Sequence, residues 1–121
     1  MSFDVLVADD SKFARRQLIR SLPESWQADL RQAGDGQQAL NSFREQKPSL
    51  MFLDLTMPNL DGFQVLETLS KEFESYSVIV ISADVQPKAV ERVTELGALS
   101  FIKKPVDADE LNNVLTKHGF L

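Results

Sequence analysis

The chain has 121 residues, the common size of one domain, and 43% of them are hydrophobic, which is enough to bury a core. With 18 acidic and 13 basic residues the net charge is −5, and the basic residues are mostly scattered, so direct nucleic-acid binding is not expected. The absence of cysteine excludes disulfides and thiolate metal sites. No apolar run approaches the ~20 residues of a membrane span, and no export signal is present, so we expect one cytoplasmic domain over residues 1–121.

Five short apolar runs predict β-strands. They lie at Phe3 to Ala8, Ala28 to Ala33, Leu50 to Leu53, Val78 to Ser82 and Ser100 to Lys103. The first, third and fourth runs are nearly continuous in apolar residues, as is typical of central strands buried on both faces. The second run alternates polar and apolar residues, so we expect it at the outer edge of the sheet.

Between and after these runs, apolar residues at helical spacing predict five amphipathic helices. Their apolar stripes are Ala14, Leu18 and Leu22; Ala39, Leu40 and Phe43; Phe63, Leu66, Leu69 and Phe73; Ala89, Val90, Val93 and Leu96; and Leu111, Val114 and Leu115. Ser11 and Asp107 are expected to cap the first and last helices, and Asp61 precedes the third. Arg15 and Arg16 are expected on a solvated helix face. The alternation of strands and helices indicates an α/β fold with a parallel sheet covered on both faces.

Five polar residues stand at or just after the ends of four predicted strands: Asp9, Asp10, Asp54, Ser82 and Lys104. Right-handed crossovers make the strands parallel, so these residues should meet at one edge of the sheet, where doubly wound sheets bind ligands. The second strand contributes no comparable residue.

Three carboxylates gathered there would repel, at about 4 kcal/mol for a pair 4 Å apart at an effective dielectric of about 20. Lys104 supplies one positive charge, and we expect a divalent cation to supply the rest. Mg²⁺ suits the few carboxylate ligands, whereas calcium needs more oxygens and zinc prefers His or Cys. Such a site favours phosphoryl transfer, with Asp54 as nucleophile, Asp9 and Asp10 holding the cation and the Ser82 hydroxyl bonding the product.

Several motifs now identify a resemblance that runs nearly the whole length of the chain. They are Val7-Ala8-Asp9-Asp10-Ser11, Leu53 through Gly62 (LDLTMPNLDG), Val80-Ile81-Ser82-Ala83 and Phe101-Ile102-Lys103-Lys104-Pro105. With them the chain resembles the CheY-like receiver domains of two-component response regulators. The resemblance implies a single flavodoxin-like (βα)5 domain, with five parallel strands in the order 2-1-3-4-5.

The same resemblance implies roles for individual residues. Asp54 would be the phosphoacceptor, Ser82 and Phe101 the switch pair and Lys104 a catalytic lysine. The metal ligands would be Asp9, Asp10, Asp54 and the Thr56 main-chain carbonyl, with Mg²⁺ as cofactor. The implied phosphodonor is a histidine kinase or histidine phosphotransfer protein. Output would pass through the face of the fourth helix, fifth strand and fifth helix to a protein target or a fused output domain, and activation is compatible with a dimer.

Three positions depart from the commonest form of the family. Thr56 stands two residues after Asp54 and Asp84 two residues after Ser82, and side chains there flank the path of the attacking water. The lifetime of the phosphorylated state therefore does not follow from the resemblance. Phe101 replaces the frequent tyrosine and has no hydroxyl to bond when turned outward.

Other functions stay open on the sequence alone. A receiver-like module that binds partners without phosphorylation would keep the fold and lose the chemistry, although the complete set of polar residues argues against it. A haloacid dehalogenase-type phosphatase would carry a second Asp where Thr56 stands, and a flavin carrier would have a Ser/Thr/Gly-rich loop after the first strand. Whether the domain works alone or within a longer protein also stays open.

Overall fold

The computed structural model describes residues 3–121, which alternate between strands and helices from end to end. The strands are β1 (Phe3–Ala8), β2 (Ala28–Ala33), β3 (Leu50–Leu53), β4 (Val78–Ser82) and β5 (Ser100–Lys103). The helices are α1 (Lys12–Ser21), α2 (Gly36–Glu45), α3 (Gly62–Glu72), α4 (Pro87–Glu95) and α5 (Ala108–Lys117). The five predicted strands are confirmed with their boundaries, because each is an apolar run bounded by polar or turn residues.

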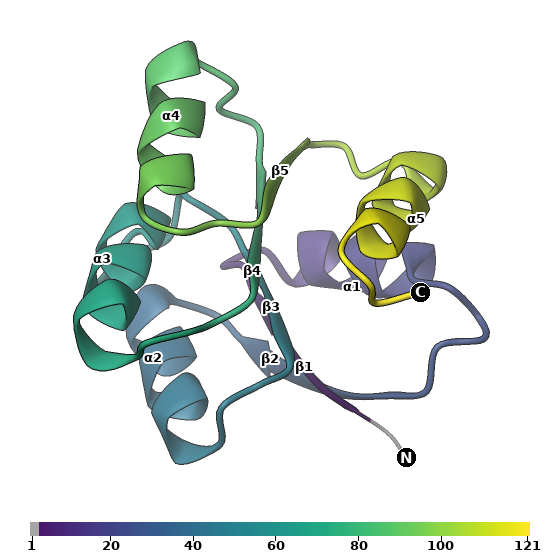
Figure 1. The fold of residues 1–121 in the computed structure, drawn as a ribbon, viewed down its shortest axis with the longest axis horizontal. Coiled ribbons are helices and arrows are strands. Elements are labelled where there is room, and N and C mark those ends of the chain that lie inside the picture. The colour runs from purple at the N-terminus through teal and green to yellow at the C-terminus, as the bar shows by residue number, and fades with distance from the viewer. Residues whose placement is uncertain (1–2) are drawn as a thin grey trace.

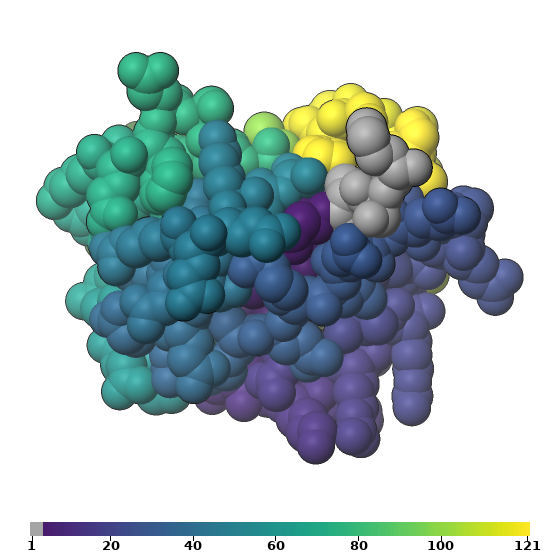
Figure 2. Space-filling model, turned by 90° about the horizontal axis from the view of Figure 1, so that it is seen from below, coloured from purple at the N-terminus to yellow at the C-terminus, as the bar shows by residue number. Residues whose placement is uncertain are grey.

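All the strands pair in parallel in one sheet, with the order β2-β1-β3-β4-β5. The expected edge position of β2 is confirmed. Helices α2, α3 and α4 cover one face of the sheet, and α1 and α5 cover the other (Figure 1). In the view from below in Figure 2, teal segments lie on the left and the yellow C-terminal segment lies at the upper right.

Alternate residues of the strands enter two hydrophobic clusters, one on each side of the sheet. Leu6, Phe43 and Leu66 belong to the cluster beneath α2, α3 and α4, while Val5 and Leu111 belong to the cluster beneath α1 and α5. Every residue of β3 and β4 is buried, as expected for central strands with both faces covered. Between residues 3 and 121, no helix has the length and hydrophobicity needed to cross a membrane.

Side-chain caps mark most of the helix starts. The side chains of Ser11, Asp35, Asp61 and Asp107 each accept a hydrogen bond from a backbone N–H in the first turn. At α3 the Gln64 side chain also accepts from the Asp61 N–H, which completes a capping box. Three residues expected on helical stripes instead form the C-caps of α1, α3 and α4 and pack against the clusters: Leu22, Phe73 and Leu96.

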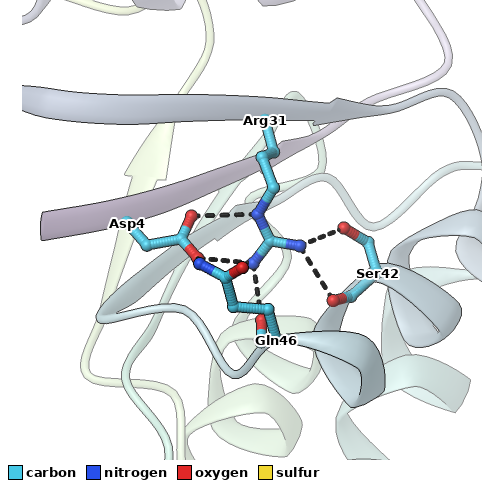
Figure 3. A network of polar contacts seen from close by, with 4 residues as sticks. All are labelled: Asp4, Arg31, Ser42 and Gln46. Atoms are coloured by element: carbon cyan, nitrogen blue, oxygen red, sulfur yellow. Dashed lines mark hydrogen bonds and ion pairs between the residues drawn. The ribbon is translucent and has the colours of Figure 1, made fainter.

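A network around Arg31 holds the edge strand β2 to its neighbours (Figure 3). The Arg31 guanidinium donates to both carboxylate oxygens of Asp4 on β1, at 2.9 and 2.8 Å. It also donates to the backbone carbonyls of Ser42 and Gln46 at the end of α2. The Ser42 carbonyl also accepts from the Gln46 N–H at 3.2 Å, so Arg31 adds a second bond at the end of α2 while it pairs with Asp4.

Two aromatic side chains fasten connecting segments that are distant in sequence. The Trp26 indole N–H, in the connection before β2, donates to the Phe120 carbonyl near the C-terminus at 2.8 Å. The Tyr76 hydroxyl, before β4, donates to the Leu96 carbonyl at the end of α4 at 2.6 Å. Both polar groups are satisfied although the rings pack against the protein.

Gly62 allows the first turn of α3 to lie directly against the end of β3. A Cβ atom at Gly62 would stand 2.5 Å from the Asp54 carbonyl oxygen and 2.7 Å from the Leu55 Cα. Both contacts are with backbone, so the segment that carries Asp54 would have to shift. The Gly62 N–H also donates to the Leu55 carbonyl at 2.9 Å, which makes the approach part of the local structure.

We predict that Gly62→Ala lowers the free energy of unfolding by about 1–3 kcal/mol, the usual cost of overpacking. The matched control is Gly34→Ala, because a Cβ at Gly34 would meet only side-chain atoms at ordinary distances of 3.5 and 3.7 Å. Urea unfolding followed by circular dichroism measures both. Equal stability of the two variants would contradict the close approach.

Candidate functional site

The backbone ladder of the sheet positions three of the polar residues. Beyond the strand ends, the Asp9 N–H donates to the Ala33 carbonyl, the Asp54 N–H to the Ala8 carbonyl and the Lys104 N–H to the Ser82 carbonyl, at 2.9 to 3.1 Å. Each residue is therefore the first after its strand and is still held by the neighbouring strand. Parallel pairing brings them to one edge of the sheet, as the sequence predicts.

The expected carboxylate cluster is present. One oxygen from each of Asp9, Asp10 and Asp54 lies within 4.8 Å of the others. Asp9 and Asp54 are only 6% and 5% exposed, whereas Asp10 is exposed. Two of the carboxylates are therefore close together and largely shielded from solvent, so their charges are poorly screened.

Lys104 reaches into this cluster from the segment after β5. Its Nζ lies 2.7 Å from Asp9 Oδ2 and 3.5 Å from Asp54 Oδ1. Burial acts to lower the pKa of Lys104, but the hydrogen bond to Asp9 and the charges of Asp54 and Asp9 outweigh it, so the pKa lies above its usual value. The lysine thus carries its charge at neutral pH and pairs more closely with Asp9 than with Asp54.

Asp54 has a raised pKa. Burial, and after it the charge of Asp9, raise the pKa of Asp54 from 3.8 to about 6 against the opposing effect of Lys104. The single ammonium of Lys104 therefore does not compensate the ionised carboxylates. At neutral pH Asp54 is mostly ionised and available as a nucleophile.

The residues present fit a hard divalent cation. Three carboxylates and one ammonium leave two negative charges uncompensated, and all the nearby ligand atoms are oxygens, which Mg²⁺ prefers. Asp9, Asp54 and Lys104 also line a cavity of about 340 Å³, but Asp10 does not, and most of the other lining residues, such as Leu18 and Phe52, are apolar. The charge and the ligand atoms of the cluster, and not this cavity, are what suit a cation.

The remaining predicted site residues lie in different settings, and Phe101 lies within β5 and not at its end. Ser82 ends β4 and is 1% exposed, and its Oγ accepts a hydrogen bond from the Asp84 N–H at 3.1 Å. Asp84 is exposed, and its Oδ1 accepts from the Gln86 N–H just before α4. Thr56 is exposed, and Phe101 is partly buried against the cluster beneath α4. The Ser82 hydroxyl is thus bonded to the loop that leads into α4.

Arg15 corrects one expectation from the sequence. Arg16 is exposed as expected, but Arg15 is partly buried and points to the site, where its Nη1 donates to the Asp9 carbonyl at 2.6 Å. Its Nε donates to the Gln32 Oε1 on β2 at 2.8 Å. Helical spacing does not reveal this contact, because it depends on how α1 lies against the end of β2.

Asp54→Asn is predicted to stabilise the protein at about pH 8 when divalent cations are removed with EDTA. Because the folded-state pKa of Asp54 exceeds its unfolded value, ionisation disfavours the fold, fully above about pH 6 and not at all below pH 3.8. The rise of about two pKa units sets an upper limit of about 3 kcal/mol. Urea unfolding should show this gain at pH 8 and a smaller one at pH 5.

Asp109→Asn serves as the matched control, because Asp109 is exposed in the first turn of α5. This control should change stability little at either pH. A loss of stability in Asp54→Asn at pH 8 would show that ionised Asp54 is better compensated than its surroundings indicate.

Comparison with known proteins identifies the family of the chain. A family model described as the response regulator receiver domain matches residues 5–116. Sporulation initiation phosphotransferase F of Bacillus subtilis is 30% identical over 118 residues, which cover 98% of this chain and 94% of that protein. The crystal structure of the CheX-CheY-BeF3-Mg+2 complex from Borrelia burgdorferi contains a chain that is 29% identical, with a TM-score of 0.89, covering 97% of this chain and 89% of that one.

One similar protein is much longer than this chain. Protein-glutamate methylesterase/protein-glutamine glutaminase 3 of Geobacter sulfurreducens is 37% identical over 102 residues, which are 84% of this chain but 27% of that protein. The chain thus spans about a quarter of that relative. The family match extends over most of the fold and includes all the residues of the carboxylate cluster and Lys104. The chain belongs to the family of response regulator receiver domains.

Proposed function

We propose that residues 1–121 form one receiver domain that accepts a phosphoryl group on Asp54 and thereby switches its partner-binding surface. The observation that carries this proposal is the buried Asp54 carboxylate beside Lys104 and two further carboxylates. The proposed donor is a phosphorylated histidine of a histidine kinase or phosphotransfer protein. Membership of the receiver family supports this choice of donor.

The transfer requires one bond to form and one to break. An Asp54 carboxylate oxygen attacks the phosphorus, the bond from phosphorus to the donor nitrogen breaks, and its electron pair remains on the histidine ring. Lys104 lies 3.5 Å from Asp54 and is placed to neutralise a phosphoryl oxygen. Positioning and charge neutralisation supply most of the catalysis in such transfers.

Mg²⁺, when bound, supplies the positive charge that the carboxylates and phosphoryl oxygens require. Asp9, Asp10 and Asp54 would hold it with the main-chain carbonyl of Thr56. The charge balance of the cluster supports a divalent ion, since Lys104 offsets only one of the carboxylates. Without the ion, Asp54 keeps a raised pKa, because it is buried and stands beside the charge of Asp9.

The switch we propose begins at Ser82. Its hydroxyl now accepts from the Asp84 N–H, and on phosphorylation it would move to donate to a phosphoryl oxygen. That movement would release the loop before α4 and allow Phe101 to turn inward. The signal would then pass through the face of α4, β5 and α5 to a protein target or a fused output domain, with dimerisation as one possible form of output.

Two exposed side chains beside the site are proposed to set the lifetime of the aspartyl phosphate. Thr56 follows Asp54 closely in the chain, and Asp84 is bonded to the loop after Ser82. Replacing either changes the polarity of the path by which water reaches the phosphorus. We further propose that the domain acts in the cytoplasm, where phosphorylated histidine donors of this kind would supply it, and that it binds no nucleic acid directly, since its net charge is −5.

Incubation with acetyl phosphate and Mg²⁺ tests phosphorylation directly. The wild-type protein is expected to gain one phosphoryl group by intact-mass spectrometry. Asp54→Asn is expected to gain none, because an amide is too weak a nucleophile to replace the carboxylate. Removal of Mg²⁺ with EDTA should abolish the adduct in the wild type.

Asp109→Asn is again the control and should be phosphorylated like the wild type. An adduct of equal abundance in Asp54→Asn would assign the phosphoryl group to another residue. Failure of the wild type to form an adduct, with acetyl phosphate and with a phosphorylated histidine donor, would favour a module that binds its partners without phosphorylation.

A further inference from the structure

Asp9 is held through all four of its polar groups. Its backbone N–H donates to the Ala33 carbonyl at 3.1 Å, and its side-chain oxygens accept from the Ser11 N–H at 2.9 Å and the Lys104 ammonium at 2.7 Å. Its backbone carbonyl accepts from Arg15 at 2.6 Å. Of these four partners, Arg15 alone is a side chain with no part in the acid–lysine cluster.

The contact from Arg15 joins three elements. Nη1 bonds the Asp9 carbonyl after β1, and Nε bonds Gln32 on β2 at 2.8 Å, while the helix that carries Arg15 is α1. Gln32 pairs with Val7 in the ladder, so its position is itself fixed by the sheet. The planar guanidinium therefore orients the peptide between Asp9 and Asp10 against a rigid frame.

The positive charge of Arg15 by itself would oppose the binding of a cation at the neighbouring carboxylates. Within residues 3–121 Arg15 forms no salt bridge, although it lies beside an acidic cluster. Its side chain donates instead to the Asp9 backbone carbonyl and to the Gln32 side-chain amide oxygen. A positive charge near a cation site weakens cation binding by repulsion. If Arg15 acted only through its charge, its removal would strengthen the binding of Mg²⁺.

We propose that Arg15 is a positioning residue for the divalent cation. It holds the peptide between Asp9 and Asp10 in place against the sheet, so that the carboxylates of both residues are oriented toward the ion. This role rests on the Mg²⁺ site proposed above. Residues that orient metal ligands in this way typically contribute 10-fold to 100-fold in affinity. The orienting effect of Arg15 outweighs its electrostatic repulsion.

Three variants separate the two effects. Arg15→Gln removes both the charge and the pair of hydrogen bonds from one guanidinium. Arg15→Lys keeps the charge but loses the planar guanidinium. Arg16→Gln removes an exposed charge from the same helix and leaves the contact with Asp9 intact. The measurement is a Mg²⁺ titration followed by the amide NMR signals of Asp54 and Leu55 in the folded protein. Because only folded molecules give these signals, a loss of stability alone does not change the measured Kd.

Positioning predicts that Arg15→Gln and Arg15→Lys both raise the Kd for Mg²⁺ by about 10-fold, while Arg16→Gln leaves it within about twofold of the wild type. The Mg²⁺ concentration that half-saturates phosphoryl attachment should rise by the same factor as the Kd. An unchanged or lower Kd in Arg15→Gln would overturn the proposal, as would wild-type affinity in Arg15→Lys. A wild type that binds no Mg²⁺ would overturn the metal site itself and the role of Arg15 with it.

Discussion

The continuation of the parallel backbone ladder beyond the strand ends is the constraint on which the site depends. Asp9, Asp54 and Lys104 each donate a backbone N–H to the neighbouring strand, so their side chains start from fixed points at one edge of the sheet. Side-chain attraction alone would not bring two ionised carboxylates together, because they repel. The folding free energy of the hydrophobic clusters on both faces of the sheet holds them there.

The resulting site is compact but electrostatically incomplete. Lys104 lies 2.7 Å from Asp9 and farther from Asp54, at 3.5 Å, which leaves the buried carboxylate of Asp54 less compensated than that of Asp9. The pKa of Asp54 is raised to about 6, mainly by burial, and the nearby Lys104 does not offset this rise. Gly62 adds a steric constraint, because the first turn of α3 packs against the Asp54 carbonyl and limits how far the backbone of Asp54 can move. The electrostatics of the cluster and the packing of α3 therefore meet at Asp54.

The sequence predicted the elements well because each strand is a distinct apolar run, and β2 alternates as an edge strand does. Periodicity did not establish the order of the strands, which came from the family resemblance. The Asp61–Gln64 capping box was visible as a spacing and was missed. Arg15 could not be found from sequence, because its contact with Asp9 depends on the angle of α1, and neither could the depth of burial that perturbs Asp54.

The bond from Trp26 to the Phe120 carbonyl has a practical meaning for spectroscopy. Trp26 is the only tryptophan of the chain, and it lies before β2, at the amino end of the sheet and thus opposite the carboxyl ends that carry Asp9 and Asp54. Its fluorescence is therefore a reporter of whether the last residues stay docked. An optical signal for events at the aspartates would need an indole introduced elsewhere.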